Sequence, residues 1–332
     1  MRVAFYITDP LTDAVAAMAL SWARHLALQY PDDHYLVLSE HPLPGDPDPF
    51  LKAPLKSIVL PPRYSLFPFW SDIVLTQKLF AFTPDLLITT APRTPAWVRC
   101  KQARVTAKAG LVVGRTETLF APLVSAAYKL LSTDEKHAIK EQWSFGREYF
   151  MLTGSYASAD QLTLLLQAFS LFKNRQQSGL KLVLPFALST HYPSLAKKIE
   201  HYKYRNALVI TGSIASEQVA QLSGAAYALV ALGSPGTNLL AIAQARCVGL
   251  PLLTLPDPDR TAVAQDTALL AAEPTKEALA AIMMQIYKDE SLRLSLIRQG
   301  QQLLSTGDVA AVTASLRAWL QQLLSAAPAT GA

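Results

Sequence analysis

The chain has 332 residues, of which 51% are hydrophobic and 17% charged, and its formal net charge is +5. This length suits two ordinary domains, and the apolar fraction is enough for a sizeable buried core. The positive excess is spread evenly, with sixteen basic against thirteen acidic residues up to Arg147 and fourteen against twelve after it. So mild an excess argues against nucleic acid as a partner.

The cysteines and the apolar runs indicate the cellular compartment of the protein. Cys100 and Cys247 are too far apart for a metal-binding spacing and do not form a disulfide framework, which predicts a reducing compartment. The opening stretch MRVAFYITDP has an apolar run too short for a signal peptide. The sequence contains no run of about 18 apolar residues, so we expect no transmembrane helix. We expect a cytoplasmic protein without a cofactor or metal, free to lie at the inner face of a membrane.

The first half of the chain alternates strand and helix patterns. Val3–Thr8 (VAFYIT) is typical of a buried strand, and a long helical pattern follows at Asp13–Tyr30. Further strand patterns lie at Tyr35–Ser39, Ser57–Leu60 and Leu86–Thr90. This alternation is typical of an α/β domain in which helices cover both faces of a parallel sheet.

A second alternation begins after a boundary that we place at residues 143–148. A strand pattern at Tyr149–Thr153 ends at Gly154, and Ser158 opens an amphipathic helix. Strand patterns follow at 180–184, 207–210, 228–232, 252–255 and 268–270, with helix patterns between them and after them. Ligands of such open sheets bind beyond the carboxyl ends of the strands, so we expect a site in a cleft between two domains.

Four stretches of the second half resemble one family. YFMLTGSYASADQLTLLLQAFSLFKNR resembles the opening of the nucleotide-sugar domain of glycosyltransferase family 4, a family with the GT-B fold. VITGSIASEQVAQLSGAAYALVAL resembles the segment after it, QDTALLAAEP resembles the family's GDAALLVDP stretch, and AIMMQIYKDESLRLSLIRQGQQ resembles its closing helices. In the first half only RVAFYITD, RVTAKAGLV and SAAYKLLSTDEKHAIKE resemble family segments.

The resemblance implies two Rossmann-like domains that face an interdomain cleft. It places a short acceptor-type domain at 1–147, a nucleotide-sugar-type domain at 148–310, and a C-terminal helix with a frayed tail at 311–332 that packs back on the first domain. It also implies retaining transfer of a sugar, of hexosyltransferase type, from a UDP- or GDP-linked donor, without an obligate metal.

The family's donor loop carries two glutamates separated by seven residues. Here Gly236 and Gln244 stand at those positions. A glutamine keeps a hydrogen-bonding group of similar reach but no charge, and a glycine offers only its backbone. Both carboxylates that the resemblance implies are therefore missing.

Three further family positions also differ. Ala159 and Asp160 replace an Arg-Lys pair that neutralises the diphosphate, and Asp160 fits better as a helix-start residue. The turn after the first strand has no glycine, and Lys108 stands where the family has a histidine. Lys108 is a weak catalytic candidate, since nothing in the sequence predicts the lowered pKa that acid–base chemistry needs.

A polar frame for a nucleotide-sugar is nevertheless present. Hydroxyl, amide and glycine backbone groups follow several strands of the second half and precede helices, an arrangement that can hold an anion. The candidate nucleotide-sugar-binding residues are Gly154, Ser155, Gly212, Ser213, Ser234, Gly236, Thr237, Asn238 and Gln244. The alternative is that they are ordinary turn and cap residues.

Two segments of the first half are candidate surfaces. No acid lies between Asp85 and Glu117, and the basic residues there form either a solvated face or an anion- or membrane-binding patch, with Arg93, Arg99, Lys101 and Arg104 as its members. The stretch PPRYSLFPFW is either a packed loop or an exposed lip that meets a membrane, a lipid-linked sugar or a partner protein through Tyr64, Phe67, Phe69 and Trp70.

The sequence therefore favours a glycosyltransferase-like protein whose activity is impaired or lost. The alternative is a non-catalytic pseudo-glycosyltransferase that acts as a binding or scaffold partner. A third reading is a rearranged site that uses Lys108 and the basic segment. His137 follows a capping-box pattern at Ser132–Glu135, which predicts a surface helix position and not a catalytic histidine.

Overall fold

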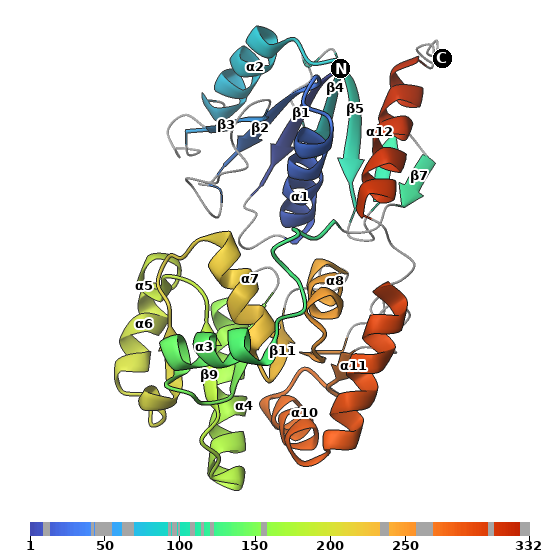
Figure 1. The fold of residues 1–332 in the computed structure, drawn as a ribbon. Coiled ribbons are helices and arrows are strands. Elements are labelled where there is room, and N and C mark those ends of the chain that lie inside the picture. The colour runs from blue at the N-terminus through green and yellow to red at the C-terminus, as the bar shows by residue number, and fades with distance from the viewer. Residues whose placement is uncertain are drawn as a thin grey trace. The chain divides into compact units, whose positions relative to one another are not determined.

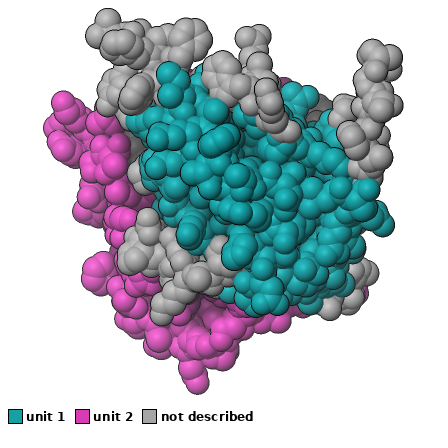
Figure 2. All heavy atoms as spheres, turned by 90° about the horizontal axis from the view of Figure 1, so that it is seen from above, with its two compact units in different colours: residues 1–123, 307–332 teal, residues 124–306 magenta. Residues whose placement is uncertain are grey.

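The computed structural model describes most of the chain. The described residues are 1–8, 14–40, 43, 55–61, 70–91, 94, 98, 100–106, 110–113, 116–119, 123–153, 158–232, 239–256, 268–304 and 309–325. Two compact units divide it: unit 1 holds residues 1–123 and 307–332, and unit 2 holds 124–306. Figure 2 colours unit 1 teal and unit 2 magenta.

Unit 1 is built on one sheet of seven described strands in the order β3-β2-β1-β4-β5-β6-β7. The first five strands pair in parallel, and β6 and β7 pair antiparallel at one edge. The elements are β1 (Arg2–Ile7), α1 (Ala14–Gln29), β2 (His34–Ser39), β3 (Leu55–Val59), α2 (Trp70–Phe82), β4 (Leu86–Thr89), β5 (Lys101–Val105), β6 (Gly110–Val113), β7 (Thr116–Leu119) and α12 (Val309–Ser325).

Helices cover both faces of this sheet. The chain moves outward from β1 to β3 and then returns to β4, so right-handed crossovers put α1 and α2 on opposite faces. On the α2 face, Leu75 and Leu79 pack on Ala4 and Tyr6 of β1. On the α1 side, Trp22 is fully buried against the sheet. The near-continuous apolar strands predicted this two-sided cover.

The C-terminal helix α12 belongs to unit 1, where it packs beside α1 (red and blue in Figure 1). The helix is bound to the rest of unit 1 through Asp33. The Asp33 carboxylate accepts hydrogen bonds at 2.9 Å from Arg317 Nε of α12 and from the N-terminal ammonium of Met1. Burial raises the pKa of Asp33, but these donors and their positive charge hold it below its usual value overall. Trp319 Nε1 donates to Thr118 Oγ1 at 3.1 Å.

Unit 2 is built on one parallel sheet of six described strands in the order β10-β9-β8-β11-β12-β13. Its elements are α3 (Thr133–Ser144), β8 (Tyr149–Leu152), α4 (Ala159–Gln176), β9 (Lys181–Leu184), α5 (Leu188–His191), α6 (Pro193–Glu200), η2 (Arg205–Ala207), β10 (Leu208–Ile210), α7 (Ser216–Ala225), β11 (Ala228–Ala231), α8 (Leu239–Val248), β12 (Leu252–Thr254), β13 (Ala268–Leu270), α10 (Lys276–Lys288) and α11 (Glu290–Leu304).

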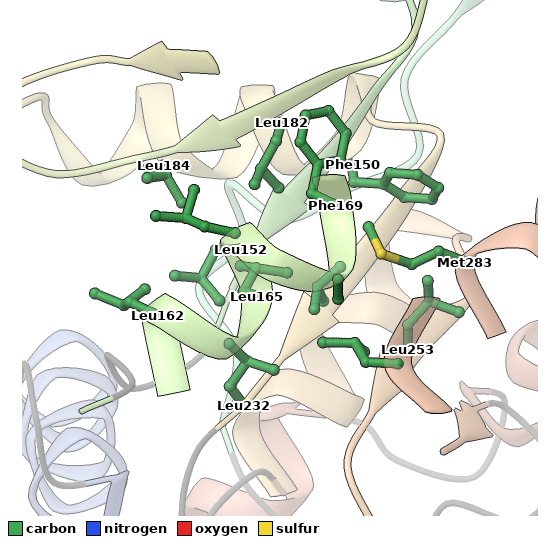
Figure 3. Close-up of a cluster of buried hydrophobic side chains, with 14 of the residues drawn as sticks. Phe150, Leu152, Leu162, Leu165, Phe169, Leu182, Leu184, Leu232, Leu253 and Met283 are labelled. Carbon is green, nitrogen blue, oxygen red and sulfur yellow. The ribbon is translucent and has the colours of Figure 1, made fainter. Parts of the chain in front are cut away.

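Successive residues of each strand in unit 2 point alternately into two hydrophobic cores, one on each face of the sheet. Phe150 and Leu152 point to the face covered by α4 and α10, where Phe169 and Met283 pack on them (Figure 3). Tyr149 and Met151 belong to the second core, which α7 and α8 cover. This alternation is the two-residue period of a strand whose faces are both buried.

The segment that enters unit 2, residues 124–132, lies against a glycine of α7. A Cβ atom at Gly224 would lie 2.8 Å from Leu131 Cδ1 and 3.0 Å from its Cγ. Helix interiors normally disfavour glycine. Here the missing side chain leaves room for Leu131, which packs against the α7–α8 core.

The strand predictions are confirmed for β1, β2, β3, β4, β8, β9, β10, β11, β12 and β13, and the capping box of Ser132 and Glu135 opens α3 as predicted. His137 is exposed on α3. The sequence reading missed α2, β5–β7 and α5–α6. The helix α3 lies in unit 2, so the expected boundary at 143–148 falls inside that unit, and the C-terminal helix begins at Val309.

We expect Arg317→Met to lower the free energy of unfolding by about 2 kcal/mol near neutral pH, because the buried Asp33 carboxylate loses one of its two charged donors and keeps only the Met1 ammonium. A lowered folded pKa gives stability that is present above the ordinary aspartate pKa, about 3.9, and that is lost as pH falls through the folded value. The difference between wild type and variant, measured by urea unfolding, should therefore shrink in acid. Arg298→Met, at an exposed position of α11, should change little at any pH.

We expect Gly224→Ala to destabilise the protein by about 1–2 kcal/mol, although alanine is the better helix former, because the new methyl group overpacks against Leu131. In a Leu131→Ala background the same substitution should instead stabilise by about 1 kcal/mol. A double-mutant cycle in urea measures this coupling. An effect of Gly224→Ala that is identical in both backgrounds contradicts the packing explanation.

Candidate functional site

The strand order of unit 2 has one reversal point. From β8 the chain moves to β9 and β10 on one side, and it then returns to β11, β12 and β13 on the other. The connections that leave β8 and β11 therefore diverge to opposite faces at the carboxyl edge. Open parallel sheets bind ligands at this position, because the diverging connections leave a crevice between them.

Thr153 and Gln244 meet beside this reversal point. Thr153 directly follows β8, and its backbone N–H donates to Val230 O of β11 at 2.8 Å. Its hydroxyl donates to Gln244 Oε1 at 3.2 Å, which brings the side chain of α8 to the end of β8. Thr153 is buried and Gln244 is half-buried. Among the described residues Gln244 Nε2 has no hydrogen-bond partner, so the amide keeps a donor for a ligand.

Gly212 and Ser213 also lie at the carboxyl edge, but two strands away from β8. They follow β10, the outer strand of the sheet. Gly212 has φ +75°, and a Cβ atom there would meet no described atom within 4 Å. Its glycine is therefore needed for the backbone conformation and not for close packing. Ser213 is exposed.

The first turn of α4 carries no positive charge. Ser158 Oγ accepts from the Gln161 backbone N–H at 3.2 Å, and Gln161 Oε1 accepts from the Ser158 N–H at 2.9 Å. This reciprocal cap already satisfies two of the donors that could have held a diphosphate. Ala159 and Asp160 are exposed beside it. The helix-start interpretation of Asp160 is therefore the better one.

The other predicted residues divide into two groups. Lys101 Nζ donates to the carbonyl oxygens of Leu323 at 2.7 Å and Leu324 at 3.1 Å, so its charge caps the end of α12, while Arg104 is exposed on β5. Trp70 begins α2. The remaining predicted residues lie outside the described residues: Tyr64, Phe67, Phe69, Arg93, Arg99, Lys108, Gly154, Ser155, Ser234, Gly236, Thr237 and Asn238.

Sequence reasoning missed a hydroxyl pair at the corresponding reversal point of unit 1, between β1 and β4. The Thr90 hydroxyl accepts from the Thr8 backbone N–H at 3.0 Å, and the two threonine hydroxyl oxygens are 3.2 Å apart. Next to them, Tyr6 donates to Glu40 Oε1 at 2.6 Å. The signal was a threonine at the end of each of two buried strands, Thr8 after β1 and Thr90 after β4.

The described residues also bear on three other features: a reactive thiol, a metal site and a membrane-spanning helix. Burial raises the pKa of the Cys247 thiol on α8, so it stays protonated and is a poor nucleophile. No three His, Cys, Asp or Glu side chains of the described residues gather as a metal site. None of the described helices combines the length and apolar character that crossing a membrane requires.

Two open, largely parallel sheets, each with helices on both faces and a reversal point beside its first strand, define the GT-B fold, and this chain has it. It is similar to HepE from Anabaena, solved with UDP and glucose (14% identity, TM-score 0.71, covering 97% of this chain and 99% of that one). It is also similar to WaaG, a glycosyltransferase involved in lipopolysaccharide biosynthesis (13%, 0.67, 95% and 98%).

The same likeness extends to a protein of another stated activity. A putative UDP-N-acetylglucosamine 2-epimerase from Listeria monocytogenes superposes with a TM-score of 0.66 at 12% identity, covering 97% of both chains. The sequence matches no protein-family model and no curated protein sequence. At these identities the likeness establishes the fold, and the function has to come from the site.

Proposed function

We propose that this protein is a glycosyltransferase-like protein that binds a nucleotide-sugar at the carboxyl edge of unit 2, and that its sugar transfer is impaired or lost. The supporting observation is the bond between Thr153 and Gln244 beside the reversal point. It orients a hydrogen-bonding side chain where the resemblance implies a group that holds the ribose. The UDP and glucose of HepE support a uridine nucleotide as the first ligand to test.

The chemistry of Gln244 favours binding over catalysis. A neutral amide can donate to and accept from ribose hydroxyls, but each of its bonds is weaker than one made by a carboxylate. Held through Oε1 by Thr153, the amide offers Nε2 as a donor. It adds no charge that could stabilise a transition state. Affinity for the nucleoside should therefore survive better than rate.

The start of α4 also favours weak catalysis, because it carries no positive charge for a diphosphate leaving group. Transfer from a diphosphate requires positive charge at the leaving group, and losing one such electrostatic contact costs about 2–4 kcal/mol of transition-state stabilisation. The exposed Asp160 and the reciprocal cap of Ser158 and Gln161 replace that charge. Any transfer that remains would be of the retaining type that the resemblance implies.

A second function, binding without catalysis in the role of a scaffold or partner, is favoured by the missing carboxylate at Gln244. The two functions share the nucleotide site and differ in turnover. Isothermal titration with UDP, UDP-glucose, UDP-N-acetylglucosamine and GDP tests the site. Following each sugar nucleotide by chromatography over hours then tests transfer to water and epimerisation. Binding with slow hydrolysis supports the transferase, and binding without turnover supports the scaffold.

We expect Gln244→Glu to tighten UDP binding about tenfold in titration calorimetry, because a charge-assisted hydrogen bond to the ribose replaces a neutral one. Gln244→Ala should weaken binding by a similar factor. Gln285→Glu, on the exposed side of α10, makes the same chemical change away from the reversal point and should leave the affinity unchanged. If no nucleotide binds wild type or Gln244→Glu, the site is not a nucleotide site and the proposed function is wrong.

A further inference from the structure

Phe145 occupies an unusual position at the end of α3. Its side chain is 80% exposed, although it is a large aromatic residue. Its backbone has φ 55°, in the left-handed region that glycine favours at a helix C-terminus. The Gly146 N–H donates to Lys140 O at 3.0 Å, so the turn is a regular helix end that does not itself call for an aromatic residue. Neither local conformation nor burial explains a phenylalanine here.

One cation lies over the exposed ring, and a second cation lies close to the first. Lys181 Nζ lies 4.4 Å from the centroid of Phe145, a cation–π distance. The Arg147 guanidinium lies over Gly179, where a Cβ atom would be 3.3 Å from Nη1. Burial and the charge of Arg147 lower the pKa of Lys181, which shows that the two cations are close enough to repel each other.

The acids nearby do not neutralise this pair. The described residues place no carboxylate within ion-pair distance of Arg147 or Lys181. Glu148 is engaged by Lys140 at 2.6 Å, and Glu141 lies against Gly146. Lys136, one turn before Lys140 on α3, also feels the charge of Glu148, so that carboxylate is shared by two lysines of α3. The local charge around Phe145 is therefore positive, with cations available to an external anion.

This surface is separate from the candidate nucleotide site. Phe145 and Arg147 precede β8, and Lys181 begins β9, so all three lie at the amino edge of the sheet. Thr153 and Gln244 lie at its carboxyl edge. A ligand at the amino edge therefore needs no nucleotide, and a test of it does not depend on the proposed function.

We propose that Phe145, Arg147 and Lys181 form a surface that docks on the phosphate headgroups of an anionic lipid bilayer. The combination of an exposed ring with unpaired cations favours this partner. An aromatic ring gains from leaving water at the headgroup level, while arginine and lysine reach lipid phosphates. A free phosphate ion would use the cations but gains nothing from the ring.

The test is sedimentation with vesicles of phosphatidylcholine, prepared with and without phosphatidylglycerol. We expect the protein to sediment with the anionic vesicles only, and to be released by salt because exposed charges are screened. Added UDP should not change the bound fraction. Equal sedimentation with both lipids, or none with either at low salt, overturns the proposal. Competition by inorganic phosphate at matched ionic strength points instead to a free-anion site and also overturns it.

Variants separate the ring from the charges. Phe145→Gly should weaken vesicle affinity about tenfold, as expected for the loss of one large apolar contact. It should also raise the thermal midpoint by about 2–4 °C, since glycine suits the left-handed conformation. Lys181→Gln and Arg147→Gln should each weaken binding about fivefold. A stable Phe145→Gly that binds like wild type contradicts the proposal without any doubt about folding.

Phe80→Ala is the matched control. Phe80 is 84% exposed on α2, in the other unit, and is therefore the strongest rival for a membrane contact. We expect vesicle binding to survive this substitution. If Phe80→Ala abolishes sedimentation while Phe145→Gly does not, the docking surface is the outer face of α2 and the proposal is wrong.

Discussion

The reversal of strand order beside the first strand of each sheet is the constraint on which the rest of the molecule depends. Parallel strands need crossover helices, and a right-handed crossover changes face when the direction along the sheet changes. In unit 2 this brings the end of β8 and the helix α8 together, and the bond from Thr153 to Gln244 joins them. The candidate site follows from this topology before any family is considered.

The same constraint has a different outcome in unit 1. There the reversal point between β1 and β4 is closed by Thr8 and Thr90, whose hydroxyl groups lie 3.2 Å apart. The Thr8 N–H donates to Thr90 and is no longer available for an anion. A glycine-rich turn would leave that donor free for a phosphate. Among the described residues, the two reversal points therefore differ: a pair of threonine hydroxyls lies at the one in unit 1, and the Gln244 amide lies at the one in unit 2.

The sequence predicted the fold better than the site, for physical reasons. Buried parallel strands such as VAFYIT carry a strong apolar signal, and the Ser132 capping box marks a helix start unambiguously. Helix α2 was missed because Ile73 and Phe80 are exposed, so no polar face marks its period. Lys101 was assigned to an anion patch because its partners, carbonyl groups of α12, lie more than two hundred residues away. Such long-range pairing leaves no local trace.

The contacts of α12 also have a consequence for the order in which the chain folds during synthesis. Unit 2 ends at residue 306, whereas unit 1 needs residues 307–332 for the helix that pairs with Asp33. Domains generally fold as units while the chain emerges. The unit that begins the chain is therefore the last to be completed. Until α12 is made, Asp33 has the Met1 ammonium but lacks the Arg317 guanidinium as a donor.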